Sequence, residues 1–148
     1  MKIVIGSDHA GFDLKGTIKT HLTGQGHEVH DVGTFDKSSC HYPAIAKEVA
    51  LAVSSGDYPR GILVCGTGIG MSMAANKVRG VRAAALSDCF TAEATRKHNN
   101  ANILCLGERT VGPGLALLLT DIFLKTEFEG GRHQTRVDMI TELEDNHL

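Results

Sequence analysis

Gly61-Ile62-Leu63-Val64-Cys65 is followed directly by Gly66-Thr67-Gly68-Ile69-Gly70, and these two segments together indicate the fold class. The first segment is continuously apolar, and so short an apolar run is typical of a strand that is covered on both faces of a parallel sheet. The second segment is rich in glycine and leads into a helical pattern at residues 69–78. A strand that ends in a glycine loop before a helix is the arrangement in which α/β proteins bind anions.

The same alternation of strand and helix extends in both directions along the chain. Short apolar runs predict four further strands, at residues 2–6, 27–32, 82–87 and 102–107. Helical patterns follow them at residues 12–24, 43–55, 88–98 and 112–126. Because helical crossovers of this length make neighbouring strands parallel, the sequence predicts an α/β fold with a doubly wound sheet of five parallel strands.

An additional C-terminal helix is predicted after Gly130-Gly131. Its apolar stripe is weak, with Val137, Ile140 and either Leu143 or Glu144 along one side. Such a helix packs either on a partner subunit or back on its own domain, and the pattern leaves both open.

Composition and charge limit the class of protein. The 148 residues, 42% hydrophobic and 22% charged, predict one globular domain over residues 1–148. A net charge of -2 provides no basic field, which argues against nucleic acid or an anionic membrane as a partner. The absence of a signal-peptide pattern and of a membrane-spanning apolar run predicts a cytoplasmic protein.

Cysteine and histidine spacing predicts neither disulfides nor a metal centre. The four cysteines lie far apart without a CxxC motif, so reduced thiols are expected. There are eight histidines, but no HExxH motif and no second ligand pair at a useful interval.

Two glycine loops predict anion binding without a nucleotide cofactor. Gly66, Gly68 and Gly70 let backbone amides approach an oxyanion, but a dinucleotide fingerprint starting at Gly66 would need glycine at Met71. The loop at residues 6–11 has the glycine spacing of a P-loop, yet Phe12-Asp13 replaces the required lysine and hydroxyl residue. A redox cofactor and ATP hydrolysis are therefore disfavoured.

Several side chains near these loops have both a structural and a chemical interpretation. Cys65 is either a small buried residue or, at a strand end beside a helix N-terminus, a usable base, with Thr67 close enough to relay a proton. Asp8 is typical of a helix cap and His9 of a loop. His98-Asn99 is either a polar turn or a proton shuttle beside an amide donor.

A pair of arginines near the C-terminus allows the same two interpretations. Arg132 and Arg136 are one helical turn apart, so they form either a phosphate clamp or solvated surface charge.

Taken together, the motifs resemble those of the ribose-5-phosphate isomerase B family over nearly the whole chain. They are Gly6-Ser7-Asp8-His9-Ala10-Gly11-Phe12, Asp31-Val32-Gly33-Thr34, Cys65-Gly66-Thr67-Gly68-Ile69-Gly70, Ala75-Asn76-Lys77, His98-Asn99 and Gly130-Gly131-Arg132-His133. The resemblance implies a Rossmann-like sheet and interconversion of an aldose phosphate and a ketose phosphate through a cis-enediolate. It also implies a homodimer, or a dimer of dimers, with active sites shared between subunits, and no metal or organic cofactor.

The resemblance also implies a role for each site residue. Cys65 is the base, and Thr67 and His98 assist opening of the sugar ring. The amides of Gly66, Gly68 and Gly70 and the side chain of Asn99 stabilise the enediolate. Asp8 and Tyr42 contact substrate hydroxyls. The phosphate is held by His9, Arg109, Arg132 and Arg136. The neighbouring subunit supplies His98, Asn99 and the arginines.

One departure from the family pattern leaves the sugar open. His41 stands before Tyr42-Pro43, where the family commonly has an acid. Ribose 5-phosphate is the leading substrate, and a six-carbon phosphate such as allose or galactose 6-phosphate is the alternative. A non-catalytic sugar-phosphate-binding module is the rival from a different class, although Cys65, Thr67 and His98 together favour an enzyme.

Overall fold

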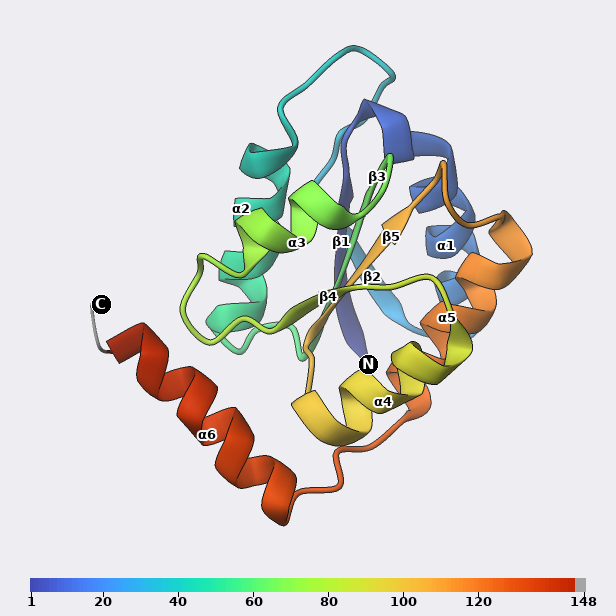
Figure 1. Ribbon diagram of the computed structural model, residues 1–148. Helices are drawn as coiled ribbons and strands as arrows, with labels where there is room; N and C mark the ends of the chain where they lie inside the picture. Colours follow the sequence, from blue (N-terminus) through green and yellow to red (C-terminus); the bar gives the residue numbers. More distant parts are fainter. Residues whose placement is uncertain (146–148) are drawn as a thin grey trace.

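The apolar stretch at residues 61–65 forms most of β3 (Arg60–Cys65), the central strand of a five-stranded sheet. The computed structural model describes residues 1–145, and its strands are parallel and ordered β2-β1-β3-β5-β4 (Figure 1). Residues 61–65 are all buried, which confirms that this strand is covered on both faces. The other strands are β1 (Lys2–Ser7), β2 (Glu28–Asp31), β4 (Ala83–Ala85) and β5 (Ile103–Gly107).

Helices cover both faces of the sheet, as the predicted doubly wound fold requires. One face carries α1 (Phe12–Gly24), α4 (Cys89–Asn99) and α5 (Pro113–Lys125), and the other carries α2 (Tyr42–Ser54) and α3 (Ile69–Ala75) (Figure 1). Successive side chains of a strand point to opposite faces of the sheet. Ile62 therefore packs in the hydrophobic core beneath α1, α4 and α5, and Leu63 packs in the core beneath α2 and α3. Each glycine loop is thereby anchored by a strand that is packed from both sides.

The edge strand β4 is shorter than the predicted strand 82–87, because side chains replace part of its backbone pairing. Asn102 Oδ1 accepts from the Arg82 amide at 2.8 Å. The Asn76 side chain accepts from the Ala83 amide and donates to the Ala83 carbonyl, at 2.8 and 2.9 Å. Helix α3 ends at Ala75, three residues before the predicted end, and Asn76 is its C-cap.

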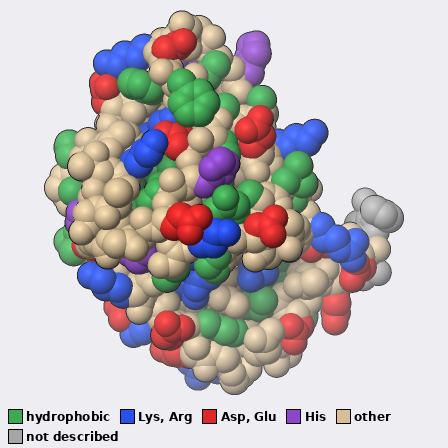
Figure 2. All heavy atoms as spheres, turned by 180° about the vertical axis from the view of Figure 1, so that it is seen from behind, with side chains coloured by type: hydrophobic (Ala, Val, Ile, Leu, Met, Phe, Trp, Pro, Cys, Tyr) green, Lys and Arg blue, Asp and Glu red, His purple; other side chains and the backbone are tan. Residues whose placement is uncertain are grey.

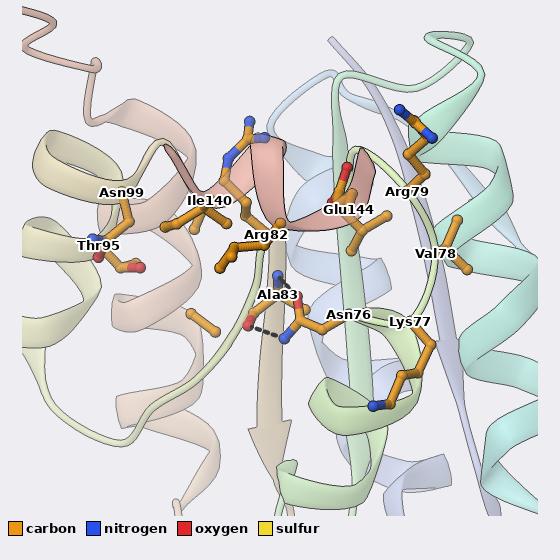
Figure 3. Close-up of a pocket in the computed structure, with 14 residues that line it drawn as sticks. Asn76, Lys77, Val78, Arg79, Arg82, Ala83, Thr95, Asn99, Ile140 and Glu144 are labelled. Carbon is orange, nitrogen blue, oxygen red and sulfur yellow. Dashed lines mark hydrogen bonds between the residues drawn. The ribbon is translucent and has the colours of Figure 1, made fainter. Parts of the chain in front are cut away.

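Helix α6 (Arg132–Asp145) begins after Gly130-Gly131, as predicted, and lies at the end of the sheet opposite the glycine loops (Figure 1). Val137 is buried, whereas Ile140 and Leu143 are 44% and 61% exposed. The Glu144 carboxylate accepts from the Gly80 amide at 3.0 Å. Between these contacts α6 spans a hollow of about 800 Å³, so the helix contacts its own domain mainly at its two ends (Figure 3).

Other sequence expectations concern the surface and the thiols. Figure 2 shows acidic and basic side chains interspersed on the rear face, with no patch of one sign. All four cysteines are free thiols, as expected. Within residues 1–145, every helix is too short or too polar to cross a membrane.

Candidate active site

Three loops meet at the carboxyl edge of the sheet, because β1, β3 and β5 are neighbours there. The Asp8 amide donates to the Val64 carbonyl at 3.2 Å. The amides of Glu108 and Arg109 donate to the carbonyls of Cys65 and Gly66, at 2.9 and 3.0 Å. The loops after the three strands are therefore bonded to one another around the end of β3.

Cys65 is the last residue of β3, and its side chain is buried beneath the central glycine loop. The residue is 5% exposed, and Sγ accepts a hydrogen bond of 3.1 Å from the Gly68 amide. The amide can reach the sulfur because Gly68 has φ +78°, a conformation that favours glycine. Thr67 Oγ1 accepts from the Ile69 amide at 3.3 Å, so both side chains are held at the start of α3.

Cys105 provides a comparison inside the same sheet. It lies in β5 with no exposed surface, and burial, followed by the neighbouring Cys65, raises the pKa of its thiol. Cys105 therefore stays protonated, and of these two neighbouring thiols only that of Cys65 lies at the loop edge.

Asp8 and His9 form the start of the first loop. Asp8 Oδ1 accepts from the amides of Ala10 and Gly11, at 2.9 and 3.1 Å, and caps the short 3-10 turn η1 (His9–Gly11), which the sequence analysis did not predict. The Cys40 amide donates to His9 Nδ1 at 3.2 Å. This bond leaves Nε2 of the neutral imidazole as a donor, which is the state that suits an anion.

Tyr42 and Arg109 flank the central glycine loop. A Cβ atom at Gly70 would lie 2.7 Å from Tyr42 Cζ, so the ring rests directly on the glycine backbone. A Cβ atom at Gly66 would lie 3.3 Å from Arg109 Nη1. Asp8, His9, Tyr42, Cys65, Thr67, Arg109 and the glycines of the loop thus form a first group of predicted site residues, at one edge of the sheet.

The remaining predicted residues form a second group at the opposite edge. His98 and Asn99 end α4, immediately before the start of β5, whereas Gly107 at the end of β5 pairs with Cys65. The length of β5 separates the groups by roughly 13 Å, since each residue of a strand advances about 3.3 Å. Arg132 and Arg136 lie on the first turns of α6 in this second group. A single chain therefore does not bring the two groups together.

His133 is a residue of the second group to which the sequence analysis assigned no role. Its ring stacks on that of His98, with centroids 4.4 Å apart and an interplanar angle of 17°. Burial, followed by the charges of His98 and Arg132, lowers the pKa of His133. Glu129 Oε2 lies 3.5 Å from His133 Nε2. The i,i+4 spacing of Glu129 and His133 was visible in the sequence, but the stacking depends on how α4 and α6 meet.

Comparisons with known proteins show the family to which the chain belongs. The Ribose/Galactose Isomerase family matches residues 3–140. The ribose-5-P isomerase B of Listeria innocua is 47% identical over 144 residues, which are 97% of both chains.

Solved structures agree over the same length. The ribose-5-phosphate isomerase B of Clostridium thermocellum superposes with a TM-score of 0.97 at 54% identity, covering 98% of each chain. That of Mycoplasma genitalium, which contains bound ribulose-5-phosphate, has a TM-score of 0.94 at 45% identity over 98% of this chain and 97% of that one. The protein is therefore a member of the Ribose/Galactose Isomerase family.

Proposed function

We propose that the protein interconverts ribose 5-phosphate and ribulose 5-phosphate by moving a proton between C1 and C2. The observation that carries this proposal is the Cys65 thiol, which lies at the strand edge and accepts from the Gly68 amide beside Thr67. Family membership supports the same reaction, as does the ribulose-5-phosphate bound to the Mycoplasma genitalium relative. Ring opening, proton transfer, stabilisation of the enediolate and phosphate binding each require a chemical group, and we assign each to a residue of the first or the second group.

The reaction starts from the closed sugar, so the ring must open first. We assign this step to Thr67 and His98, which exchange protons with the ring oxygen and the C1 hydroxyl. Cys65 then takes the proton from C2, and the electron pair moves through the C1–C2 bond onto the carbonyl oxygen to form a cis-enediolate. The same proton returns to C1, while the proton on O2 moves to O1, and ribulose 5-phosphate results.

The negative charge of the enediolate needs hydrogen-bond donors. We assign these to the amides of Gly66 and Gly70 and to the Asn99 side chain. The family resemblance also implied that the Gly68 amide stabilises the enediolate. In the structure this amide donates to the Cys65 sulfur. We assign the contacts with substrate hydroxyls to Asp8 and Tyr42.

The phosphate requires a basic cluster at the far end of the substrate. We assign this role to His9 Nε2, Arg109, Arg132 and Arg136. Holding a flexible open-chain sugar by its phosphate keeps C1 and C2 beside the base, which lowers the entropic cost of reaction.

We further propose that a homodimer completes each active site. His98, Asn99, Arg132 and Arg136 lie a strand length from Cys65 in one chain, so the partner has to supply them. Apolar Ile140 and Leu143 line the hollow beside α6, which is suited to receive a second copy (Figure 3). A two-fold axis would form two equivalent sites, and a dimer of dimers would keep them.

We also propose a cytoplasmic location, with which the free cysteines agree.

Turnover of the purified, chelator-treated protein on three sugars tests the proposal. Ribose 5-phosphate is compared with allose 6-phosphate and galactose 6-phosphate, with Cys65→Ala as the control. Fast conversion of the pentose that depends on Cys65 is the expected result. Activity on a hexose phosphate alone would keep the chemistry and change the substrate, whereas binding without any turnover would identify a sugar-phosphate-binding module.

A further inference from the structure

Three side chains with metal-binding atoms converge in the second group of site residues. His98, Glu129 and His133 each present one nitrogen or oxygen atom, and these atoms all lie within 4.8 Å of one another. Among residues 1–145 this is the one group of three histidine, cysteine or acidic side chains that meets this distance. The ligands come from α4, the segment before α6, and α6 itself, so no sequence motif could have indicated them.

The backbone around this cluster is held in place by hydrogen bonds. The Glu129 amide donates to the Lys97 carbonyl at 3.1 Å, which ties the segment before α6 to the end of α4. Arg96 is 1% exposed and donates to the Thr126 carbonyl at 3.2 Å and to Asn100 Oδ1 at 2.9 Å. The end of α4 and the start of α6 are therefore fixed relative to each other before any ligand binds.

The donor set determines which ions fit. Two imidazole nitrogens and one carboxylate favour zinc and similar transition metals over magnesium or calcium, which prefer oxygen ligands. Ligand bonds of about 2.1 Å in a tetrahedral site place two ligand atoms about 3.4 Å apart. Glu129 Oε2 and His133 Nε2 are already 3.5 Å apart. The rings of His98 and His133 lie nearly parallel, with an interplanar angle of 17°, so both have to rotate out of the stack to direct their nitrogens at one ion.

We propose that His98, Glu129 and His133 form an inhibitory site for a divalent transition-metal ion such as zinc. The ion takes the lone pair of His98 that ring opening requires, so a bound ion blocks turnover; this consequence rests on the proposed function. The positive charges of Arg132 and Arg136 oppose the cation and limit its affinity. A water or substrate oxygen completes the coordination of the ion.

Calorimetric titration of zinc into the chelator-treated full chain tests the site without reference to activity. We expect one zinc ion per chain and an affinity at least about ten-fold weaker in Glu129→Gln and His133→Asn, since even outer-shell changes cost that much. Glu127→Gln is the matched control, because it removes a charge from the same segment outside the cluster. Equal zinc binding by all four proteins, or none by the wild type, would overturn the site. Circular dichroism checks that each variant is folded.

Turnover measurements test the inhibition separately. Zinc should stop isomerisation by the wild type, magnesium at the same concentration should not, and a chelator should restore the rate. Glu129→Gln, which the proposed chemistry does not use, should remain active and need about ten-fold more zinc for the same inhibition. Zinc bound at the cluster with turnover unchanged would overturn the inhibitory role. An absence of turnover on every sugar phosphate would instead count against the proposed function, and calorimetry would still decide the metal site.

Discussion

The backbone amide of Gly68 donates a hydrogen bond of 3.1 Å to the sulfur of Cys65. This contact fixes the position of the sulfur at the start of α3. It depends on the left-handed conformation of Gly68, three residues beyond the end of the strand. The proposed base and the turn that starts α3 therefore form one structural unit.

Replacing Cys65 by alanine should remove turnover and leave substrate binding nearly intact. We expect kcat to fall by roughly 10²-fold or more, the usual contribution of a positioned base. Steady-state kinetics and direct titration with ribose 5-phosphate measure the two effects separately. Cys89→Ser, a change of a thiol away from the loops, is the control, and an unchanged kcat in Cys65→Ala would remove the thiol from the mechanism.

Replacing Gly68 by alanine should damage both stability and activity. The new Cβ would lie 3.1 Å from the Cys105 backbone, at a residue with φ +78°. We expect a loss of about 1–2 kcal/mol in the free energy of unfolding. Gly16→Ala is the matched control, since a Cβ there meets nothing within 4 Å in the middle of α1 and should stabilise by about 0.5–1 kcal/mol. Urea unfolding measures the change in unfolding free energy of each variant relative to the wild type. A change of the same sign in both variants would contradict the strain at Gly68.

Replacing Arg136 by alanine should weaken substrate binding more than it slows the chemical step. Loss of a charged hydrogen bond to phosphate should raise KM roughly ten-fold or more. Lysine at this position should recover part of the loss, because it keeps the charge but not the two-pronged geometry. A KM equal to that of the wild type for all three sugar phosphates would exclude Arg136 from the clamp.

Mixing two inactive variants tests whether the active sites are shared. In a mixed dimer of Cys65→Ala with His98→Asn, one site carries both defects and the other carries neither. Random reassociation should therefore restore about a quarter of the wild-type activity. A mixture of Cys65→Ala with Cys65→Ser serves as the control, because every site then lacks the thiol. No recovery beyond that control would indicate that each chain uses its own His98.

The buried ion pair of Lys15 and Asp31 predicts a dependence of stability on pH. Burial opposes ionisation of Asp31, but hydrogen bonds from Lys15, at 2.8 Å, and from the Gly33 amide outweigh it and lower the pKa of the carboxyl. The pKa of Asp31 in the folded protein lies below its usual value of 3.8. The ionised carboxylate therefore stabilises the fold above pH 3.8, and this stabilisation is lost as the pH falls through the folded pKa.

Asp31→Asn should therefore cost about 2–3 kcal/mol of unfolding free energy at pH 7 and less at pH 3, which lies below the usual pKa of the carboxyl. Urea unfolding at the two pH values measures the difference. Glu48→Gln, a change on the exposed face of α2, should cost little at either pH. An equal cost of Asp31→Asn at both pH values would show that the ionised pair does not stabilise the fold.

The order and type of the main elements could be predicted from the sequence, because they depend on patterns that are local in the chain. The apolar run at residues 61–65 and the glycines after it indicate a buried strand and an anion loop whatever the rest of the chain does. The boundaries of β4 and α3 were not predicted correctly; near them the Asn76 and Asn102 side chains bond to backbone amides in contacts that no local pattern indicates.

The candidate site divides in the same way. Residue types and motif order predict that a thiol, glycine amides, two histidines and arginines serve one reaction. The folded chain shows that Cys65 and His98 lie at opposite ends of β5, and that His98 stacks on His133 beside Glu129. The physical reason is that strand order and helix docking join residues far apart in the chain, and the spacing of residues along a sequence carries no record of those distances.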